Sequence, residues 1–463
     1  MEQDLDKTAS SPSESSSKKK KVCVIGAGIS GLAAARELRR EGLDVTVIEQ
    51  NGGVGGQWLY DAAIDAGDPL GLAGVHSSMY ASVRLNSPRE IGGFSDFPFF
   101  PTGAGGDGRR YPVHGELLRF IRDFCDVFGL MDAVRLNTTV TRVAMDGSPS
   151  RWTVRSKHRD AAGDGEEVFD AVVVATGHYT QPRLPAIEGM DTWRRRHLHS
   201  HSYRVQDTFA GEVVVIVGCS VSGIELALEL RRVAIEVHLS AKSIDDGLAP
   251  MMSKLLAARH KHGNIHLRPK VEHLHDDGTV VFDGGESVIA DTIIYCTGYN
   301  YSFPFLDIDG KVTVDDNRVG PLFEHVFPPS LAPSLSFIGI PAKVILPRFV
   351  EMQASWVAQV VSGKRTLPSP EEMMRAVEEY NAARDAAGVP KRQTHAAFLD
   401  LEYHDEYGER VCGFPRMEDW RKELIRSSIS DLLGDIETFR DDYHDSDLLG
   451  DSLRLLGWTT SRQ

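Results

Sequence analysis

The sequence predicts an α/β protein with two Rossmann-like dinucleotide-binding domains, one of them inserted in the other. Two observations lead to this fold class. An apolar strand, a glycine-rich turn and a helix follow one another twice, near residue 26 and again near residue 218. Two further apolar strands end in Thr-Gly, at 176–177 and 297–298, on either side of the second unit. The chain of 463 residues is long enough for two domains.

The first unit lies in the stretch KVCVIGAGISGLAAARELRREGLDVTVIEQ, residues 21–50. Gly26 allows a tight turn, Gly28 lets a pyrophosphate approach the backbone, and Gly31 lets the helix pack closely on the strand. Free N–H groups at the helix start attract phosphates, and Glu49 ends the second strand where it can bind a ribose 2′-hydroxyl. A tightly packed helix without a ligand is the alternative. The predicted turn comprises Gly26, Ala27, Gly28, Ile29, Ser30 and Gly31.

The second unit lies in EVVVIVGCSVSGIELALELRRVAIEVHLSAKS, residues 212–243. Ser220 stands where the middle glycine belongs, and a serine also tolerates a nearby phosphate. Lys242, not an acid, follows the second strand; a cation there suits the 2′-phosphate of NADPH, whereas an acid would select NADH. A solvated surface lysine is the alternative for Lys242. The predicted turn comprises Gly218, Cys219, Ser220, Val221, Ser222 and Gly223.

The second turn also allows an interpretation from another class of protein. A strand, G-x-S-x-G and a helix form the nucleophile elbow of an α/β-hydrolase. Here the spacing fails by one residue, because Ser222 occupies the place of the final glycine. A hydrolase that uses Ser220 therefore stays as a remote alternative to the dinucleotide site.

The placement of the Thr-Gly pairs predicts how the domains are arranged. Glu49 after the first turn indicates FAD, and Lys242 after the second indicates NADPH. We expect a disordered tail at 1–20, a first part of the FAD-binding domain at 21–182, an inserted NADPH-binding domain at 183–297, and the rest of the FAD-binding domain with C-terminal helices at 298–463. The crossings between the domains would carry Thr176, Gly177, Thr297 and Gly298.

Charge and cysteine content exclude several classes. The formal net charge of −15 argues against nucleic acid or an anionic membrane as a partner, and no apolar run is long enough to span a membrane. The five cysteines are scattered and include no C-x-x-C pair, which disfavours a disulfide framework, a thiolate zinc site and a disulfide reductase. A reducing compartment, the cytoplasm, is expected.

The stretch RRRHLHSHSYR, residues 194–204, raises the question of a metal. His197, His199 and His201 occupy alternate positions, and side chains at alternate positions of a strand face the same way. Three convergent imidazoles are a pattern that catalytic zinc sites use.

The two motifs, the two crossings and this histidine stretch together resemble the flavin-containing monooxygenases. The resemblance is greatest to the soluble plant branch that includes glucosinolate S-oxygenases, and it runs from about residue 21 to the C-terminal helices. Further matching stretches are Gly55-Gly56-x-Trp58, VRLNSPRE, FSDFPFFP, VGPLFEHVFPP and GVPKRQTH. The family signature F-x-G-x-x-x-H-x-x-x-Y corresponds to Trp193, Arg195, His199 and Tyr203, with Arg195 in place of glycine. Only His199 of the three histidines falls on it, so no metal site is expected.

The resemblance implies an activity. NADPH would reduce FAD, a C4a-hydroperoxyflavin would form with O₂, and one oxygen atom would pass to a soft nucleophile. We expect the sulfur of a small thioether; N-hydroxylation of an amine or amino acid by the same intermediate is the alternative. No nucleic-acid partner is implied, and a homodimer is allowed.

The resemblance also implies site residues. Asn86, in VRLNSPRE, would hydrogen-bond the hydroperoxide or the nicotinamide; a turn residue before Pro88 is the alternative. Besides the two turns, Glu49 and Lys242, the expected cofactor-binding residues are Gly56, Gln57, Trp58, Thr176, Gly177, His199, Tyr203, Thr297 and Gly298.

Overall fold

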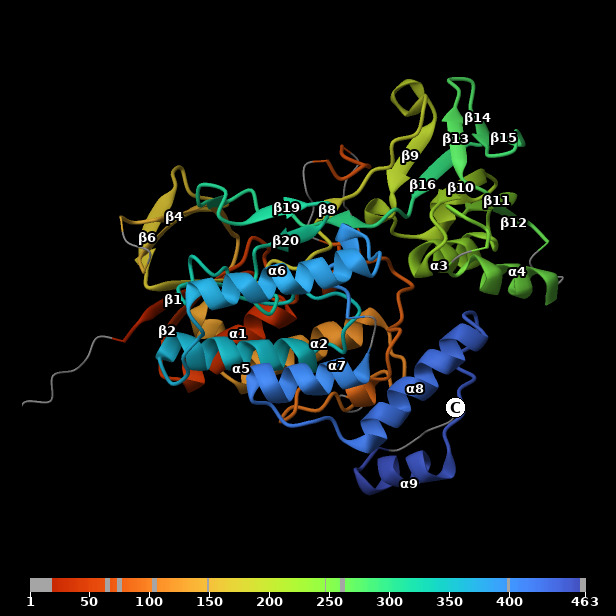
Figure 1. The fold of residues 1–463 in the computed structure, drawn as a ribbon. Coiled ribbons are helices and arrows are strands. Elements are labelled where there is room, and N and C mark those ends of the chain that lie inside the picture. Colours follow the sequence, from red (N-terminus) through yellow and green to blue (C-terminus); the bar gives the residue numbers. More distant parts are fainter. Residues whose placement is uncertain are drawn as a thin grey trace, which may run out of the picture.

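The computed structural model has two lobes, each built around a five-stranded parallel sheet (Figure 1). The structure describes residues 19–62, 67–72, 77–101, 106–147, 150–245, 247–258, 263–397 and 400–458. The tail expected at 1–20 therefore lies outside the described residues except for its last two. No helix within these ranges is long and apolar enough to cross a membrane.

The first lobe contains a sheet with strand order β21-β7-β1-β2-β3, in which every pair is parallel. Helices α1 (Ile29–Arg40) and α5 (Arg348–Ser362) pack against each other beside this sheet. A buried ion pair joins them, from Arg36 Nη2 to Glu351 Oε1 at 2.8 Å. The strands are β1 (Lys21–Ile25), β2 (Asp44–Ile48), β3 (Val134–Arg135), β7 (Ala171–Val174) and β21 (Leu335–Phe337).

A second, mostly antiparallel sheet extends this lobe. Helix α2 (His114–Val127) packs into the core of the first sheet. The apolar face of α2 buries Phe120 and Phe124 against Phe94 of the FSDFPFFP loop. The strands of the second sheet are β18 (Leu306–Asp307), β4 (Thr138–Met145), β5 (Trp152–His158) and β6 (Gly165–Phe169). A small hairpin pairs β19 (Thr313–Asp315) with β20 (Arg318–Gly320).

The second lobe, yellow to green in Figure 1, is formed by residues between the two Thr-Gly pairs. Its parallel sheet has the order β12-β11-β10-β16-β9, and α3 (Val221–Leu230) packs on it. A three-stranded antiparallel sheet and α4 (Ala249–Ala258) complete the lobe. The strands are β9 (Arg196–His199), β10 (Val213–Val217), β11 (Glu236–Ser240), β12 (Ile265–Arg268), β13 (Val271–Leu274), β14 (Thr279–Phe282), β15 (Ser287–Ile289) and β16 (Thr292–Tyr295).

Two short strands mark the place where the chain passes between the lobes. Strand β8 (Gln181–Pro182) pairs antiparallel with β17 (Tyr299–Asn300). Strand β21 then joins the first sheet beside β7, so the first lobe is assembled from residues before and after the second.

The C-terminal part follows with α6 (Pro370–Ala386), α7 (Leu401–Glu406), α8 (Asp419–Gly434) and α9 (Asp447–Leu455). Residues 435–445, between α8 and α9, are called the C-terminal arm below. Ile436 of the arm is buried in the core of the second lobe. Asp445, at the other end of the arm, pairs with Arg110 of the first lobe. The arm therefore contacts both lobes.

Candidate functional site

The first glycine-rich turn joins β1 to α1, and its three glycines serve different needs. Gly26 has φ +103°, and a Cβ there would lie 2.6 Å from the carbonyl oxygen of Ala175. A Cβ on Gly31 would lie 1.9 Å from the carbonyl oxygen of Gly26. Gly28 differs, because its φ is −76° and the nearest atom to an added Cβ is 3.6 Å away. The protein's own packing requires the outer glycines, whereas the space at Gly28 suits a phosphate at the helix N-terminus.

Glu49 is fixed beside this turn. Its carboxylate is 4% exposed and accepts hydrogen bonds from the backbone N–H of Ala27 at 2.7 Å and of Asn51 at 2.8 Å. Burial raises the pKa of Glu49, and these N–H groups act against that shift. Each carboxylate oxygen keeps a lone pair for a hydroxyl donor. The position therefore fits the ribose of a bound dinucleotide.

Residues 55–58 lie over the same turn. Gly55 N–H donates to the carbonyl oxygen of Ala27 at 3.0 Å, and Gly56 has φ +56°. A Cβ on Gly56 would lie 3.0 Å from the Cα of Gly28. Gln57 and Trp58 follow in a half-buried 3₁₀ turn. The start of this segment therefore lies against the first turn, and the cofactor-binding role of Gly56, Gln57 and Trp58 stays a prediction.

The second glycine-rich turn repeats the outer part of this geometry. Gly218 has φ +117°, and its Cβ would lie 2.4 Å from the carbonyl oxygen of Cys296. Gly223 repeats the 1.9 Å approach, here to the carbonyl oxygen of Gly218. Ser220 takes the middle position as an exposed residue at the start of α3. Cys219 beside it is half-buried, and burial raises the pKa of its thiol to about 11. The turn is built like the first and is open at its centre.

The geometry of Ser220 also bears on the hydrolase alternative. Its backbone is extended, with φ −113° and ψ −175°, instead of the strained turn of a nucleophile elbow. In the described residues its hydroxyl makes no cap hydrogen bond and has no histidine partner. The structure supplies no general base for this serine.

Lys242 lies just beyond β11 and is exposed. The preceding Ala241 donates its backbone N–H to the carbonyl oxygen of Arg268 at 2.9 Å, which fixes the strand end. Across residues 19–458, as far as they are described, the Lys242 ammonium forms no ion pair. It is thus available to a phosphate near the second turn.

Each Thr-Gly crossing lies against one of the two turns. Ala175, before Thr176 and Gly177, contacts Gly26; Cys296, before Thr297 and Gly298, contacts Gly218. Gly177 and Gly298 have φ +71° and +81°. Thr297 donates its hydroxyl to the carbonyl oxygen of Arg183. The fold therefore brings each crossing to the turn of its own sheet.

His199 supports the second crossing from inside. It is fully buried, its Nδ1 accepts the backbone N–H of His201 at 3.1 Å, and Nε2 donates to the carbonyl oxygen of Gly298 at 3.0 Å. Burial lowers the pKa of His199 to about 4, so the ring is neutral. Tyr203 is buried as well, against Tyr80 and Phe209. Both ring nitrogens of His199 are engaged by protein, so it can act on a cofactor only through the crossing.

The three alternating histidines do not form one cluster. Strand β9 ends at His199 and His201 lies on a 3₁₀ turn, so the strand periodicity stops between them. His197 is directed to the Tyr295 hydroxyl, at 3.4 Å. The expectation that these histidines hold no metal stays a prediction.

Among the described residues, three other side chains do bring potential metal ligands within 4.8 Å of one another: Glu236, His238 and His266. His238 Nδ1 accepts a hydrogen bond from Arg268 Nε at 3.1 Å, and Nε2 faces Glu236 at 3.0 Å. A guanidinium bound to the same ring repels a cation. We therefore describe this group as a hydrogen-bonded ionic network.

Arg195, the departure from the family signature, has a structural explanation. Its guanidinium donates to the carbonyl oxygens of Ala290 at 2.9 Å and Asp277 at 2.7 Å. It packs on Gly278, where a Cβ would lie 2.1 Å from Arg195 Nε. Arg195 thus ties the start of β9 to the β13–β15 sheet.

Asn86 lies exposed on the loop before Pro88, and sequence reasoning missed its partner. Arg440, in the C-terminal arm, donates to Asn86 Oδ1 and to Glu225 on α3. No local signal connects residues separated by 354 positions.

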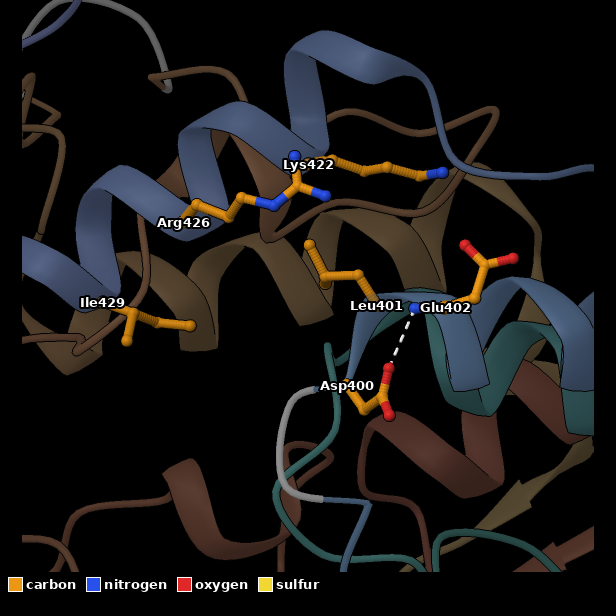
Figure 2. Close-up of a pocket in the computed structure, with 6 residues that line it drawn as sticks. All are labelled: Asp400, Leu401, Glu402, Lys422, Arg426 and Ile429. Carbon is orange, nitrogen blue, oxygen red and sulfur yellow. Dashed lines mark hydrogen bonds between the residues drawn. The ribbon is translucent and has the colours of Figure 1, made fainter.

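A pocket of about 320 Å³ between α7 and α8 contains none of the predicted site residues (Figure 2). Figure 2 shows Asp400 at the start of α7, where Oδ1 accepts the backbone N–H of Glu402 at 3.0 Å. Lys422 on α8 is ion-paired with Asp405. The pocket is lined by Asp400, Leu401, Glu402, Lys422, Arg426 and Ile429.

Comparison with a family model and with known relatives gives matches over ranges that include both glycine-rich turns. Residues 19–249 and 248–419 match the flavin-binding monooxygenase-like family model. The chain is 52% identical over 448 residues to flavin-containing monooxygenase FMO GS-OX-like 8 of Arabidopsis thaliana, which covers 95% of both chains. Identity to FMO GS-OX-like 9 of the same plant is 51%, over 95% of this chain and 96% of the relative.

Solved structures are also similar to this chain over nearly its whole length. The S-allyl-L-cysteine S-oxygenase of Allium sativum superimposes with a TM-score of 0.87 at 43% identity, covering 95% of this chain and 98% of the other. Tmm of Pelagibacter sp. strain HTCC7211 shares the fold with a TM-score of 0.73 at 22% identity, covering 92% of this chain and 94% of the other. The chain therefore belongs to the flavin-binding monooxygenase-like family and is an enzyme with FAD and NADPH as its cofactors.

Proposed function

We propose that this enzyme is an S-oxygenase acting on a small-molecule thioether. The observation that carries the proposal is its 43% identity and TM-score of 0.87 to the garlic S-allyl-L-cysteine S-oxygenase over nearly the whole chain. The reaction balances as thioether, O₂, NADPH and a proton giving sulfoxide, NADP⁺ and water. When bound, the flavin supplies the two-electron chemistry that activates O₂.

The first turn would hold the FAD. The extended backbone at Gly28, which carries no side chain, and the N–H groups at the start of α1 suit its pyrophosphate. Glu49, already oriented by Ala27 and Asn51, would accept hydrogen bonds from the ribose. Gly56, which lies against Gly28, would exclude water from this side together with Gln57 and Trp58 of the same 3₁₀ turn. Thr176 and Gly177, at the crossing beside this turn, would complete the FAD site.

The second turn would hold the NADPH. Ser220 can donate its hydroxyl to a phosphate, and the exposed Lys242 ammonium suits the 2′-phosphate. Thr297 and Gly298, supported by His199, would shape the backbone beside the turn. Tyr203 would contribute by packing. The exposure of Ser220 and Lys242 leaves this side open for exchange of the nucleotide.

Asn86 would be the residue nearest the reacting atoms. It offers a neutral amide, which can donate or accept a hydrogen bond without competing as a base. The enzyme itself needs no nucleophile, because the cofactor carries the chemistry.

The cysteine pattern supports a reducing compartment such as the cytoplasm. All five cysteines are free, and four of them are buried. Burial raises the pKa of the buried thiols, which keeps them unreactive.

The test is oxidation of NADPH by the purified, flavin-loaded enzyme, with sulfoxide and N-oxide quantified over a panel of thioethers and amines. We expect one sulfoxide per NADPH with at least one thioether, and loss of that product without loss of flavin in Asn86→Ala. Preparation without bound flavin would overturn the proposal. N-hydroxylated products alone would replace it with the amine alternative.

A further inference from the structure

The loop that carries Asn86 lies between the C-terminal arm and helix α3 of the second lobe. Tyr80 donates its hydroxyl to Glu225 Oε2 at 3.1 Å, and Ser82 donates to Glu229 Oε2 at 2.7 Å. Both acids are on α3, which begins directly after the second glycine-rich turn. The loop is therefore connected to the helix whose N-terminus faces the NADPH site.

Arg440 of the arm contacts both the Asn86 loop and α3. Its Nε donates to the carbonyl oxygen of Leu85 at 3.0 Å, and its Nη2 donates both to Asn86 Oδ1 and to Glu225 Oε1. The side chain is only 14% exposed, and its guanidinium lies 4.6 Å from the centre of the Phe439 ring. One half-buried cation thus holds the Leu85 carbonyl, the Asn86 amide and α3 together.

These contacts determine which end of the amide is free. An arginine guanidinium has donors only, so it must face the carbonyl oxygen of Asn86 and not the NH₂ group. In the described part of the chain, no residue accepts a hydrogen bond from Nδ2. The amide is therefore presented with its NH₂ group outward.

The arm is anchored so that Arg440 cannot easily leave. Ile436 is buried in the core of the second lobe, and Glu437 pairs with Arg231 at 3.0 Å. On the other side Asp441 pairs with Arg84 at 2.8 Å, and Asp445 forms a two-pronged pair with Arg110 at 2.6 and 2.8 Å. Arg440 lies between these two sets of anchors.

We propose that Arg440 is a positioning residue for the reaction: it turns the Asn86 amide so that its NH₂ group serves as donor at the reacting centre. Through Glu225 it also couples that orientation to the helix of the NADPH turn. This inference rests on the proposed role of Asn86. Arg440 acts through Asn86, since its Nε and Nη2 donate to Leu85, Asn86 and Glu225.

The test compares Arg440→Ala, Arg440→Lys and Asn86→Ala in the flavin-loaded full chain. The first readout is the share of oxidised NADPH that appears as sulfoxide instead of H₂O₂. The second, independent of turnover, is the dissociation constant of NADP⁺ from the change in the flavin absorption spectrum. Flavin content and melting temperature check the fold of each variant.

Loss of a hydrogen bond to a charged group predicts a fall of about tenfold in sulfoxide yield for Arg440→Ala. We expect Arg440→Lys, which keeps a charged donor but not the planar fork, to lose less sulfoxide yield than Arg440→Ala. The Arg440→Ala/Asn86→Ala double variant should lose no more than Asn86→Ala, because both changes act on one amide. The NADP⁺ dissociation constant of Arg440→Ala should rise no more than about threefold.

Glu437→Gln is the matched control, because it weakens the arm beside α3 without touching Asn86. An equal loss of yield in Glu437→Gln and Arg440→Ala would show that only docking of the arm matters, and would overturn the inference. A loss in Asn86→Ala with none in Arg440→Ala would overturn it while leaving the proposed function in place. No sulfoxide from the unmodified enzyme would instead overturn the proposed function.

Discussion

The two glycine-rich turns agree at their outer positions and differ at their centres. Gly26 and Gly218 both have positive φ and approach the carbonyl oxygen of the residue that precedes a Thr-Gly crossing. Gly31 and Gly223 both approach a backbone oxygen at 1.9 Å. The middle residues diverge, since residues 55–58 lie over Gly28, whereas Ser220 is exposed. The fold therefore requires the outer glycines, whereas packing does not determine the middle residue, which is where the proposal places the phosphates.

The residues that follow the second strand of each unit show the same contrast. Glu49 is buried and held by two backbone N–H groups, whereas Lys242 is exposed without an ion pair in the described chain. This contrast fits the proposal that the first turn holds FAD permanently. It also fits the proposal that NADPH exchanges at the second.

The largest expected effect is the loss of FAD affinity when the middle glycine of the first turn is replaced. Gly28→Val should fold, because the backbone at Gly28 is extended and has room for a Cβ, yet the side chain should block the pyrophosphate. We expect FAD affinity to fall at least about a hundredfold, or roughly 3 kcal/mol. Flavin absorbance per protein, with circular dichroism for the fold, measures this. Normal flavin content would disprove the assignment. Gly31→Ala, the control, should fail to fold.

The next largest effect is a loss of folding stability at acid pH, caused by His199 beside the second crossing. His199 is neutral in the folded protein because its pKa is lowered to about 4, whereas in the unfolded chain it titrates near 6.5. The contribution of His199 to the free energy of unfolding is complete above pH 6.5 and is lost as the pH falls toward 4. At pH 5 about 2 kcal/mol of it has been lost.

Urea unfolding of His199→Gln and the unmodified protein at pH 8 and pH 5 measures this difference. The loss between the two pH values should be smaller in the variant. The other histidines whose pKa burial lowers to about 4, His325 and His404, contribute equally to both proteins. Identical pH dependence would show that His199 is not responsible.

A moderate effect is expected from the cation of the second unit. Lys242→Ala should weaken NADPH about tenfold and NADH less than about twofold, because only NADPH carries the 2′-phosphate. Dissociation constants from anaerobic flavin reduction give both values. Equal losses for the two nucleotides would mean that Lys242 does not recognise the phosphate.

The smallest effect is expected at the middle of the second turn. Ser220→Ala removes one hydroxyl donor and should weaken NADPH by about threefold. Ser220→Gly should behave in the same way, since neither variant adds a side chain that blocks the phosphate. Isothermal titration calorimetry with NADP⁺ measures the dissociation constant of each variant. Loss of an esterase activity in Ser220→Ala would favour the hydrolase alternative.

The sequence was most informative where the physics is local. A tight turn, close packing of a helix on a strand and burial of an apolar strand each require particular residues at fixed spacing, so both units could be predicted. The histidine pattern was less reliable because strand periodicity applies only as far as the strand, which ends at His199.

Contacts between distant segments could not be read in this way. Arg440 reaches Asn86 from the far end of the chain, and Arg195 reaches the β13–β15 sheet through backbone carbonyls, which leave no trace in side-chain identity. Such partners depend on how the lobes and the arm pack. The role of Asn86 was suggested by resemblance alone, and the structure added its partner.

The pairing of β8 with β17 has a consequence for how this chain can be engineered. Paired strands lie about 5 Å apart, so the second lobe leaves the first as a loop whose two ends are neighbours. A loop of that kind can be replaced without pulling the remaining sheet apart. The proposed NADPH turn and Lys242 both lie in this second lobe, and Arg440 with its arm forms a contact that any replacement lobe must match.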